Sequence, residues 1–269
     1  MAKKGTLQNG GEHAPLRMDR IRIVPMARMQ GYWPRWVLLL LLVAVSPKAH
    51  TQVLIALILG DDLNSGKIEF GLTTGLNAST LDGVPGGEPA RAPYLGLYFD
   101  IKLSENWYFH PETWPKCVLG EAKLKPYATG DPALDVQLAD ATVRRRIDCI
   151  PTSFMITRKL GQHVFIDAGP YGNLILGGRD VFTRESADDE LSYTQKIGDQ
   201  LHRVELGAGI GARYKLSKGL GMNFGVHYFA GLTGVDKADQ WKFQWLSASV
   251  GIPIGRGKAK KAAETKPAE

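Results

Sequence analysis

Two pairs of side chains in this sequence have types and spacing that suit acid–base chemistry. His110 and Glu112 lie two positions apart, which on a strand puts both on one face, as a general base and its orienting carboxylate require. Asp167 and His227 form a second candidate pair, two members of a Ser–His–Asp triad. The sequence has no G-x-S-x-G motif, and we expect no serine near either histidine in the strand register. We therefore predict that both pairs are structural and that the chain is not an enzyme.

The glycine cluster Gly207-Ala-Gly209-Ile-Gly211 raises the question of a phosphate-binding loop. A dinucleotide fingerprint reads G-x-G-x-x-G and lies between a strand and a helix, whereas this spacing is G-x-G-x-G. The residues around the cluster alternate between apolar and polar or small types with period two. We interpret the cluster as the interior of a β-strand and expect no cofactor.

Charge and cysteine content exclude two further classes of protein. Residues 1–36 hold seven Lys and Arg against two acidic residues, and residues 255–269 hold five against two, so the remaining chain has a slight acidic excess. Its body therefore lacks the basic surface of a nucleic-acid-binding protein. Cys117 and Cys149 lack the spacing of a zinc site, so we expect no metal. We predict free thiols, although an oxidising compartment allows a disulfide.

The N-terminal region has the pattern of a secretory signal peptide. Arg28 and Arg35 precede an apolar run of about ten residues, WVLLLLLVAV, which is too short to cross a bilayer as a helix. We predict a leader over residues 1–51, cleaved after Ala49 or Thr51, with an uncleaved anchor as the alternative. Residues 52–66 would then form a short apolar segment at the periplasmic mouth of the folded domain.

The rest of the chain repeats one pattern, a strand of alternating polarity, eight times. Several of these strands reach the 9–11 residues that a tilted strand needs to cross a membrane. We predict strands at 67–77, 93–103, 106–118, 142–158, 162–176, 200–215, 219–230 and 242–254. Short turns (104–105, 159–162 and 216–219) alternate with longer polar connections (78–92, 119–141, 177–199 and 231–241).

This arrangement is typical of an outer-membrane barrel, with tight periplasmic turns and longer external loops. We predict an all-β fold, an eight-stranded antiparallel up-and-down transmembrane β-barrel over 67–254, with both termini in the periplasm and a basic tail at 255–269. A soluble, lipocalin-like lipid-binding barrel remains the alternative, and it would need apolar side chains on the inner face. A barrel enzyme of the hydrolase type is the other alternative.

Successive residues of each predicted strand lie on opposite faces, one of them apolar. If the apolar face contacts lipid, ten polar residues point into the barrel, where we expect them to pair because unpaired buried charges are costly. They are Glu69, Asp100, Lys102, His110, Glu112, Asp167, Glu205, Arg213, Lys215 and His227. Eight glycines also lie at inward-facing positions and would relieve crowding there: Gly71, Gly75, Gly96, Gly207, Gly209, Gly211, Gly221 and Gly225. We expect Trp107, Tyr108, Trp241 and Trp245, near strand ends, to form aromatic belts, with core packing as the alternative.

Four stretches resemble the PorT-type outer-membrane β-barrel family of Gram-negative bacteria. They are VLIALILGDDLNSGKIEFGLTTGLNAS (53–79), LGLYFDIKLSENWYFHPE (95–112), DCIPTSFMITRKL (148–160) and LGAGIGARYKLSKGLGMNFGVHY (206–228). The resemblance implies insertion into the outer membrane by the barrel assembly machinery, contact with outer-membrane lipid, and envelope or secretion-system proteins as partners. We accordingly expect a non-enzymatic barrel with a structural, surface-binding or export-accessory role that binds no nucleic acid.

Overall fold

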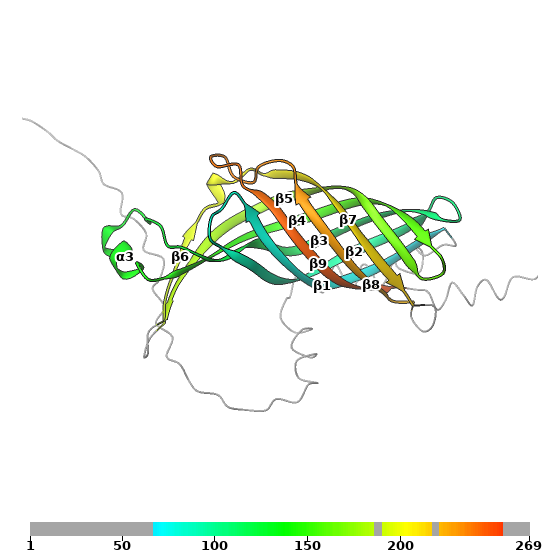
Figure 1. Ribbon diagram of the computed structural model, residues 1–269, viewed down its shortest axis with the longest axis horizontal. Coiled ribbons are helices and arrows are strands. Elements are labelled where there is room, and N and C mark those ends of the chain that lie inside the picture. Colours follow the sequence, from blue (N-terminus) through cyan, green and yellow to red (C-terminus); the bar gives the residue numbers. More distant parts are fainter. Residues whose placement is uncertain (1–66, 186–189, 217–220, 255–269) are drawn as a thin grey trace, which may run out of the picture.

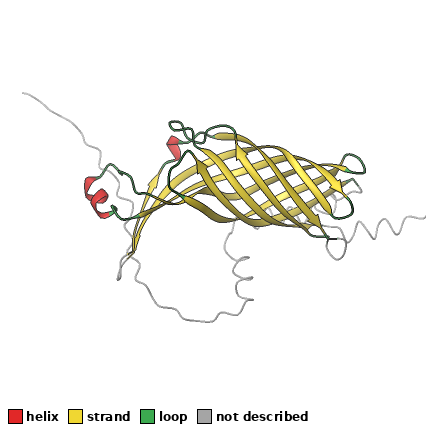
Figure 2. Cartoon of the chain, in the orientation of Figure 1, coloured by secondary structure: helices red, strands yellow, loops and turns green. Residues whose placement is uncertain are grey.

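The computed structural model describes residues 67–185, 190–216 and 221–254. The predicted leader, the segment at 52–66 and the C-terminal tail lie outside these ranges. Strands make up most of the described chain (Figure 2). The elements are β1 (Ile68–Asp82), β2 (Glu88–Lys102), β3 (Trp107–Leu124), α3 (Pro132–Gln137), β4 (Thr142–Leu160), β5 (Val164–Glu185), β6 (Glu190–Lys196), the 3₁₀ turn η1 (Gly198–Gln200), β7 (Val204–Lys215), β8 (Asn223–Gly231) and β9 (Lys242–Pro253).

Eight of the strands form a closed antiparallel ring. Their order around the ring is β1, β2, β3, β4, β5, β7, β8 and β9, and β9 pairs with β1 to close it. The β1–β9 register runs from Gly71 opposite Pro253 to Asp82 opposite Lys242. The predicted fold, an eight-stranded antiparallel barrel, is confirmed.

The wall of the barrel continues beyond the ring on one side. The last residues of β5 pair with the start of β4 on one edge and with β6 on the other. This extension carries α3 and projects from one end of the barrel (Figure 1). It has its own small core, in which Val143 and Phe182 pack with Leu124, Leu138 and Ala141. We call β6, α3 and the paired parts of β4 and β5 from 142–146 and 179–185 the apical extension.

The connections differ from the prediction at this end of the barrel. Residues 78–92 are not a long loop, because β1 and β2 stay paired as far as Ser79 opposite Ala90 and the turn is 83–87. Residues 177–199 are not simply a solvated loop either, since they contain the end of β5 and all of β6. A strand hairpin that continues beyond the ring buries only one row of apolar side chains, here Phe182 opposite Tyr193, so its pattern is weak in the sequence. Within 119–141, β3 continues to Leu124 and α3 follows.

The two faces of the wall have opposite chemistry. Outward positions on several strands are apolar and exposed, for example Leu174 (47%), Ile210 (58%) and Val226 (52%). Inward positions carry charged, polar and aromatic side chains that are buried. This distribution is the reverse of that in a lipid-carrying soluble barrel.

Candidate functional site: the polar network and aromatic layer inside the barrel

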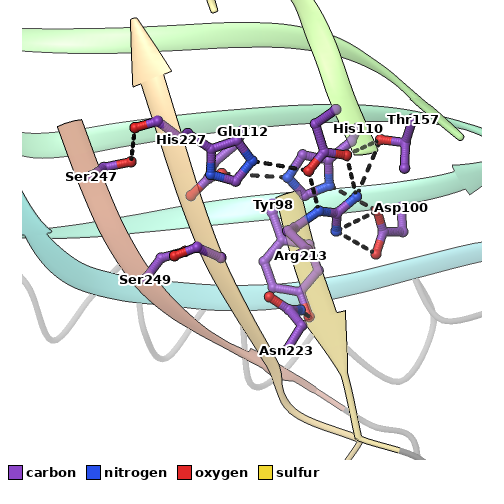
Figure 3. A network of polar contacts seen from close by, with 12 residues as sticks. Tyr98, Asp100, His110, Glu112, Thr157, Arg213, Asn223, His227, Ser247 and Ser249 are labelled. Atoms are coloured by element: carbon purple, nitrogen blue, oxygen red, sulfur yellow. Dashed lines mark hydrogen bonds and ion pairs between the residues drawn. The ribbon is translucent and has the colours of Figure 1, made fainter. Parts of the chain in front are cut away.

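Six charged or titratable side chains converge inside the ring from five strands. Alternation along each strand turns them inward, and the closed wall brings together residues that are far apart in the sequence. All six are buried and lie toward the end of the barrel at which β2 ends and β5 begins; Figure 3 labels all of them except Asp167. They are Asp100 from β2, His110 and Glu112 from β3, Asp167 from β5, Arg213 from β7 and His227 from β8. We call this group the central network.

Arg213 lies at the centre of this network, between two carboxylates. Its Nη1 donates to both oxygens of Asp100, at 3.0 and 3.1 Å. Its Nε and Nη2 donate to Asp167 Oδ2 and Oδ1, at 2.8 and 3.0 Å, and Nη2 also reaches Thr157 Oγ1 at 3.2 Å. The Asp167 contact is the bidentate arrangement that makes Arg–carboxylate pairs strong. Arg213 therefore forms ion pairs with two buried carboxylates at once.

The two histidines extend the network on either side of Arg213. The ring nitrogens of His110 lie 2.8 Å from Asp100 Oδ1 and 3.4 Å from Glu112 Oε2. Ionised carboxylates only accept hydrogen bonds, so a doubly protonated imidazole satisfies both contacts. The Nε2 of His227 lies 2.9 Å from Asp167 Oδ2. Both pairs proposed from the sequence thus belong to one network.

At the rim near the turn 103–106, the network ends in a lysine. The Nζ of Lys215 donates to Glu69 Oε1 at 2.6 Å and lies 3.7 Å from Asp100 Oδ2. Lys102 was predicted to point inward with these residues, but it is exposed at the end of β2. It pairs with Tyr108 beside the turn, where the wall ends and solvent reaches the side chain.

Glu205 lies apart from the central network. Its two carboxylate oxygens accept hydrogen bonds from Tyr171 Oη at 2.7 Å and from Asn173 Nδ2 at 2.8 Å. The residue is fully buried, and the partners in both of these hydrogen bonds are uncharged side chains. The sequence predicted its inward position but not these partners.

An aromatic layer fills the barrel next to the central network. Trp114 links the two, because its Nε1 donates to Glu112 Oε1 at 2.6 Å. Its ring packs against Phe229 and Trp245, with centroids 5.5 and 6.5 Å apart. Tyr171 and Tyr94 complete the layer, at 4.7 Å from Trp245 and 4.6 Å from Trp114. The interior is thus packed with side chains, as expected for eight strands.

The aromatic belt predicted at the strand ends is wrong for three of its four members. Tyr108 lies on the inward face of β3, with its ring 5.7 Å from that of the buried Phe165. Trp245 is 1% exposed and lies inside the barrel, and Trp241 packs against the same core. Trp107 remains exposed at 43%. Core packing, the alternative, holds for both Trp245, which lies at an inward position of β9, and Trp241, which lies just before β9 and packs against the same core.

The glycine cluster lies within β7, as the alternation predicts. A side chain at Gly209 would collide with the Phe229 ring, and one at Gly211 would collide with the His227 ring. Glycine here makes room for large inward side chains of β8. Gly221 does not share this role, since it lies in the turn before β8 with φ +68°.

A serine does lie beside one of the histidines, contrary to the expectation from the sequence. Ser247 on β9 is directly opposite His227. Its hydroxyl lies 3.5 Å from the main-chain oxygen of His227 rather than bonding to the imidazole, and the serine is fully buried. The β8–β9 register, which the sequence does not specify, creates this proximity. The observed hydrogen bonds do not form a Ser–His–Asp relay.

A second polar cluster lies in and beside the apical extension. Arg145 donates to both oxygens of Asp180, through Nε at 2.9 Å and Nη2 at 2.6 Å, and its guanidinium lies over the Trp241 ring. Tyr127 donates to Asp180 Oδ2 at 2.7 Å. Burial, together with this bond to a carboxylate, raises the pKa of Tyr127. This cluster is not evident from the sequence, because an Arg145–Asp180 pair requires the extended β4–β5 register.

Cys117 and Cys149 are directly opposite each other on β3 and β4 and are both buried free thiols. The described residues contain no group of three or more His, Cys, Asp or Glu side chains arranged for a metal ion. In the described part of the chain, no helix is long and apolar enough to cross a membrane.

A closed eight-stranded ring with an apolar outer face and a charged, hydrogen-bonded interior defines the class of small outer-membrane β-barrel proteins. The family model described as "Outer membrane protein beta-barrel domain" matches residues 60–237, more than half of the chain. The chain belongs to this family and is a protein of the outer membrane. No curated protein matches it.

Several solved outer-membrane proteins are similar in fold. Ail, the attachment invasion locus protein of Yersinia pestis, has a TM-score of 0.39 and 10% identity, covering 70% of this chain and 99% of that chain. Neisserial surface protein A has a TM-score of 0.36 and 12% identity, covering 70% and 97%. OprG from Pseudomonas aeruginosa has a TM-score of 0.33 and 10% identity, covering 69% and 91%. These likenesses are too distant to bear on function.

Proposed function

We propose that this protein is a non-enzymatic outer-membrane anchor that holds a binding structure, the apical extension, on the cell surface. The observation that carries the proposal is the continuation of β4 and β5 beyond the ring to pair with each other and with β6. Closure of the barrel does not need these residues. A structure with its own apolar core, raised above the membrane, is suited to contact with a partner.

The filled interior supports an anchoring role rather than transport. The central network and the aromatic layer occupy neighbouring levels along the barrel interior, and their members are buried. Each charged side chain of the central network makes hydrogen bonds within the site, so none is held ready for a substrate. The same pairing supports the non-enzymatic assignment.

The lengths of the connections support an orientation with the termini in the periplasm. The turn 103–106 and the turn 161–163 are short and lie at the end of the barrel where β1 begins. The connections 125–141, 197–203 and 232–241 lie at the other end, together with the apical extension. Outer-membrane barrels place short turns in the periplasm and longer loops outside.

The PorT-type assignment is part of this proposal and is supported by the four sequence stretches that resemble that family. Under this assignment, the partner of the apical extension is an envelope or secretion-system protein. Outer-membrane lipid surrounds the barrel wall, and the barrel assembly machinery inserts it.

Photocrosslinking in intact cells tests the proposed role. A photoreactive amino acid at Val136, on α3 and 77% exposed, should give an adduct with another protein. The same group at Val226, on the outward barrel face, is the matched control and should give lipid adducts only. If positions throughout the apical extension gave no protein adduct in a correctly inserted barrel, the surface-binding role would be wrong.

A further inference from the structure

Three basic residues form a row across the outer surface at the base of the apical extension. Arg146 on β4 is directly opposite Arg179 on β5, and Arg179 is directly opposite Lys196 on β6. Their neighbours Arg145 and Asp180 face inward, so alternation turns the row outward. Arg179 and Lys196 are exposed, and Arg146 is half-buried. We call these three residues the basic row.

Little in the described structure compensates the charge of the basic row. Like charges directly opposite each other on neighbouring strands are destabilising. The one ion pair recorded for the row in the described residues joins Arg179 Nη2 to Asp148 Oδ2, at the long distance of 3.7 Å. The Nε of Arg146 is buried and has no hydrogen-bond partner there. Apart from the long Arg179–Asp148 pair, the described residues therefore provide no ion-pair partner for the three cations.

The row also lies at a particular depth along the barrel. Below it on β5, the outward side chains are Leu174 and Leu176, exposed at 47% and 53%. Above it lies the rest of the apical extension, where Phe182 packs in a separate core. The basic row therefore marks the level at which the apolar band ends, which is the level of lipid headgroups.

We propose that the basic row binds the phosphate groups of the phosphorylated glycolipid in the outer leaflet. Guanidinium groups match phosphate oxygens in geometry, and two adjacent arginines can hold one phosphate with paired hydrogen bonds. The lipid would supply the negative charge that the row lacks and would fix the base of the apical extension against the membrane. The assignment to the outer leaflet, but not the phosphate site itself, rests on the proposed orientation.

Native mass spectrometry of the detergent-solubilised protein, titrated with diphosphoryl lipid A, tests the site. Both rims are accessible in detergent, so the result does not depend on which end faces outward in the cell. Arg146→Gln, Arg179→Gln and Lys196→Gln together should weaken binding by on the order of 100-fold, since each cation near an anionic lipid surface contributes to the affinity. The matched control removes three basic residues at the opposite rim, Lys102, Arg158 and Lys159, and should bind as the wild type does.

Two further titrations identify the ligand chemistry. Lipid A from which both phosphates have been removed should bind as weakly as the triple variant does. Phosphatidylglycerol should bind more weakly than diphosphoryl lipid A, because it offers one phosphodiester. Equal binding by wild type and triple variant, an equal loss in the opposite-rim control, or equal binding of phosphatidylglycerol would each overturn the proposal. Heat-modifiable migration on gels confirms that each variant is folded.

Discussion

Replacing Arg213 by methionine removes the centre of the buried polar network while keeping an unbranched apolar side chain. In the native structure Arg213 donates four hydrogen bonds to Asp100 and Asp167 and a fifth to Thr157. Both carboxylates are buried, with exposures of 6% and 0%. The variant therefore leaves two buried negative charges whose remaining partners are His110, His227 and, at longer range, Lys215.

Breaking a buried ion pair by removal of one partner typically costs about 3–5 kcal/mol in the free energy of unfolding. Arg213 serves two carboxylates, so we expect a loss at the upper end of that range. Lys123→Met is the matched control, because Lys123 pairs with Glu88 at 2.9 Å but both side chains are more than half exposed. Exposed pairs contribute about 0–1 kcal/mol, so this variant should be nearly neutral.

Reversible urea unfolding in phospholipid vesicles, followed by tryptophan fluorescence, measures both variants. Adding Asp100→Asn and Asp167→Asn to Arg213→Met removes the stranded charges and should recover part of the lost stability. If Arg213→Met unfolded at the same urea concentration as Lys123→Met, the central network would not contribute as described. A triple variant less stable than Arg213→Met would likewise refute the role of the stranded carboxylates.

Three other predictions follow from separate parts of the structure. Val226→Arg on the outward face should cost about 2–4 kcal/mol if it lies near the bilayer midplane; Val226→Leu is its control, and equal stability of the two in vesicle unfolding would contradict lipid exposure. Cys117 and Cys149 should both react with an alkylating agent in denaturant without prior reduction, and a mass increase seen only after reduction would show a disulfide instead. Burial of Asp236 opposes its ionisation, but hydrogen bonds from the backbone N–H groups of Asp239, Trp241 and Ala238 outweigh this and lower its pKa. Its stabilisation of the loop 232–241 should therefore be complete above the unfolded-state pKa of about 3.9 and lost as the pH falls through the lower folded-state pKa. Amide hydrogen exchange at Trp241 should show this loss in the wild type and a flat response in Asp236→Asn.

The barrel itself was predictable because a membrane imposes a strict pattern. Outward positions within the apolar band are mostly apolar and every crossing must be paired, so alternation in β2 and β8 is visible in single segments. The inward direction of Asp100, Asp167 and Arg213 follows from the same alternation. The alternation does not show which of these residues contact one another, because residues such as Asp100 and Arg213 are brought together only by the closure of the ring.

The apical extension was not predictable in the same way. Its strands lie beyond the apolar band, so only a few positions such as Val143 and Phe182 need to be buried. Polar residues at the remaining positions gave the segment 177–199 the composition of a loop. The pairing of Ser247 with His227 was missed for a different reason, since register depends on the loop between β8 and β9 and not on the pattern within either strand.

The accessibility of two epitope tags on intact cells tests the orientation of the apical extension most directly. One tag is inserted at Asp188, between β5 and β6, and the other follows Glu269. We expect antibody to reach the Asp188 tag on intact cells and to reach the Glu269 tag only after the outer membrane is permeabilised. Labelling of the C-terminal tag on intact cells, with protection of the Asp188 tag in an inserted protein, would place the apical extension in the periplasm and contradict its proposed role at the cell surface.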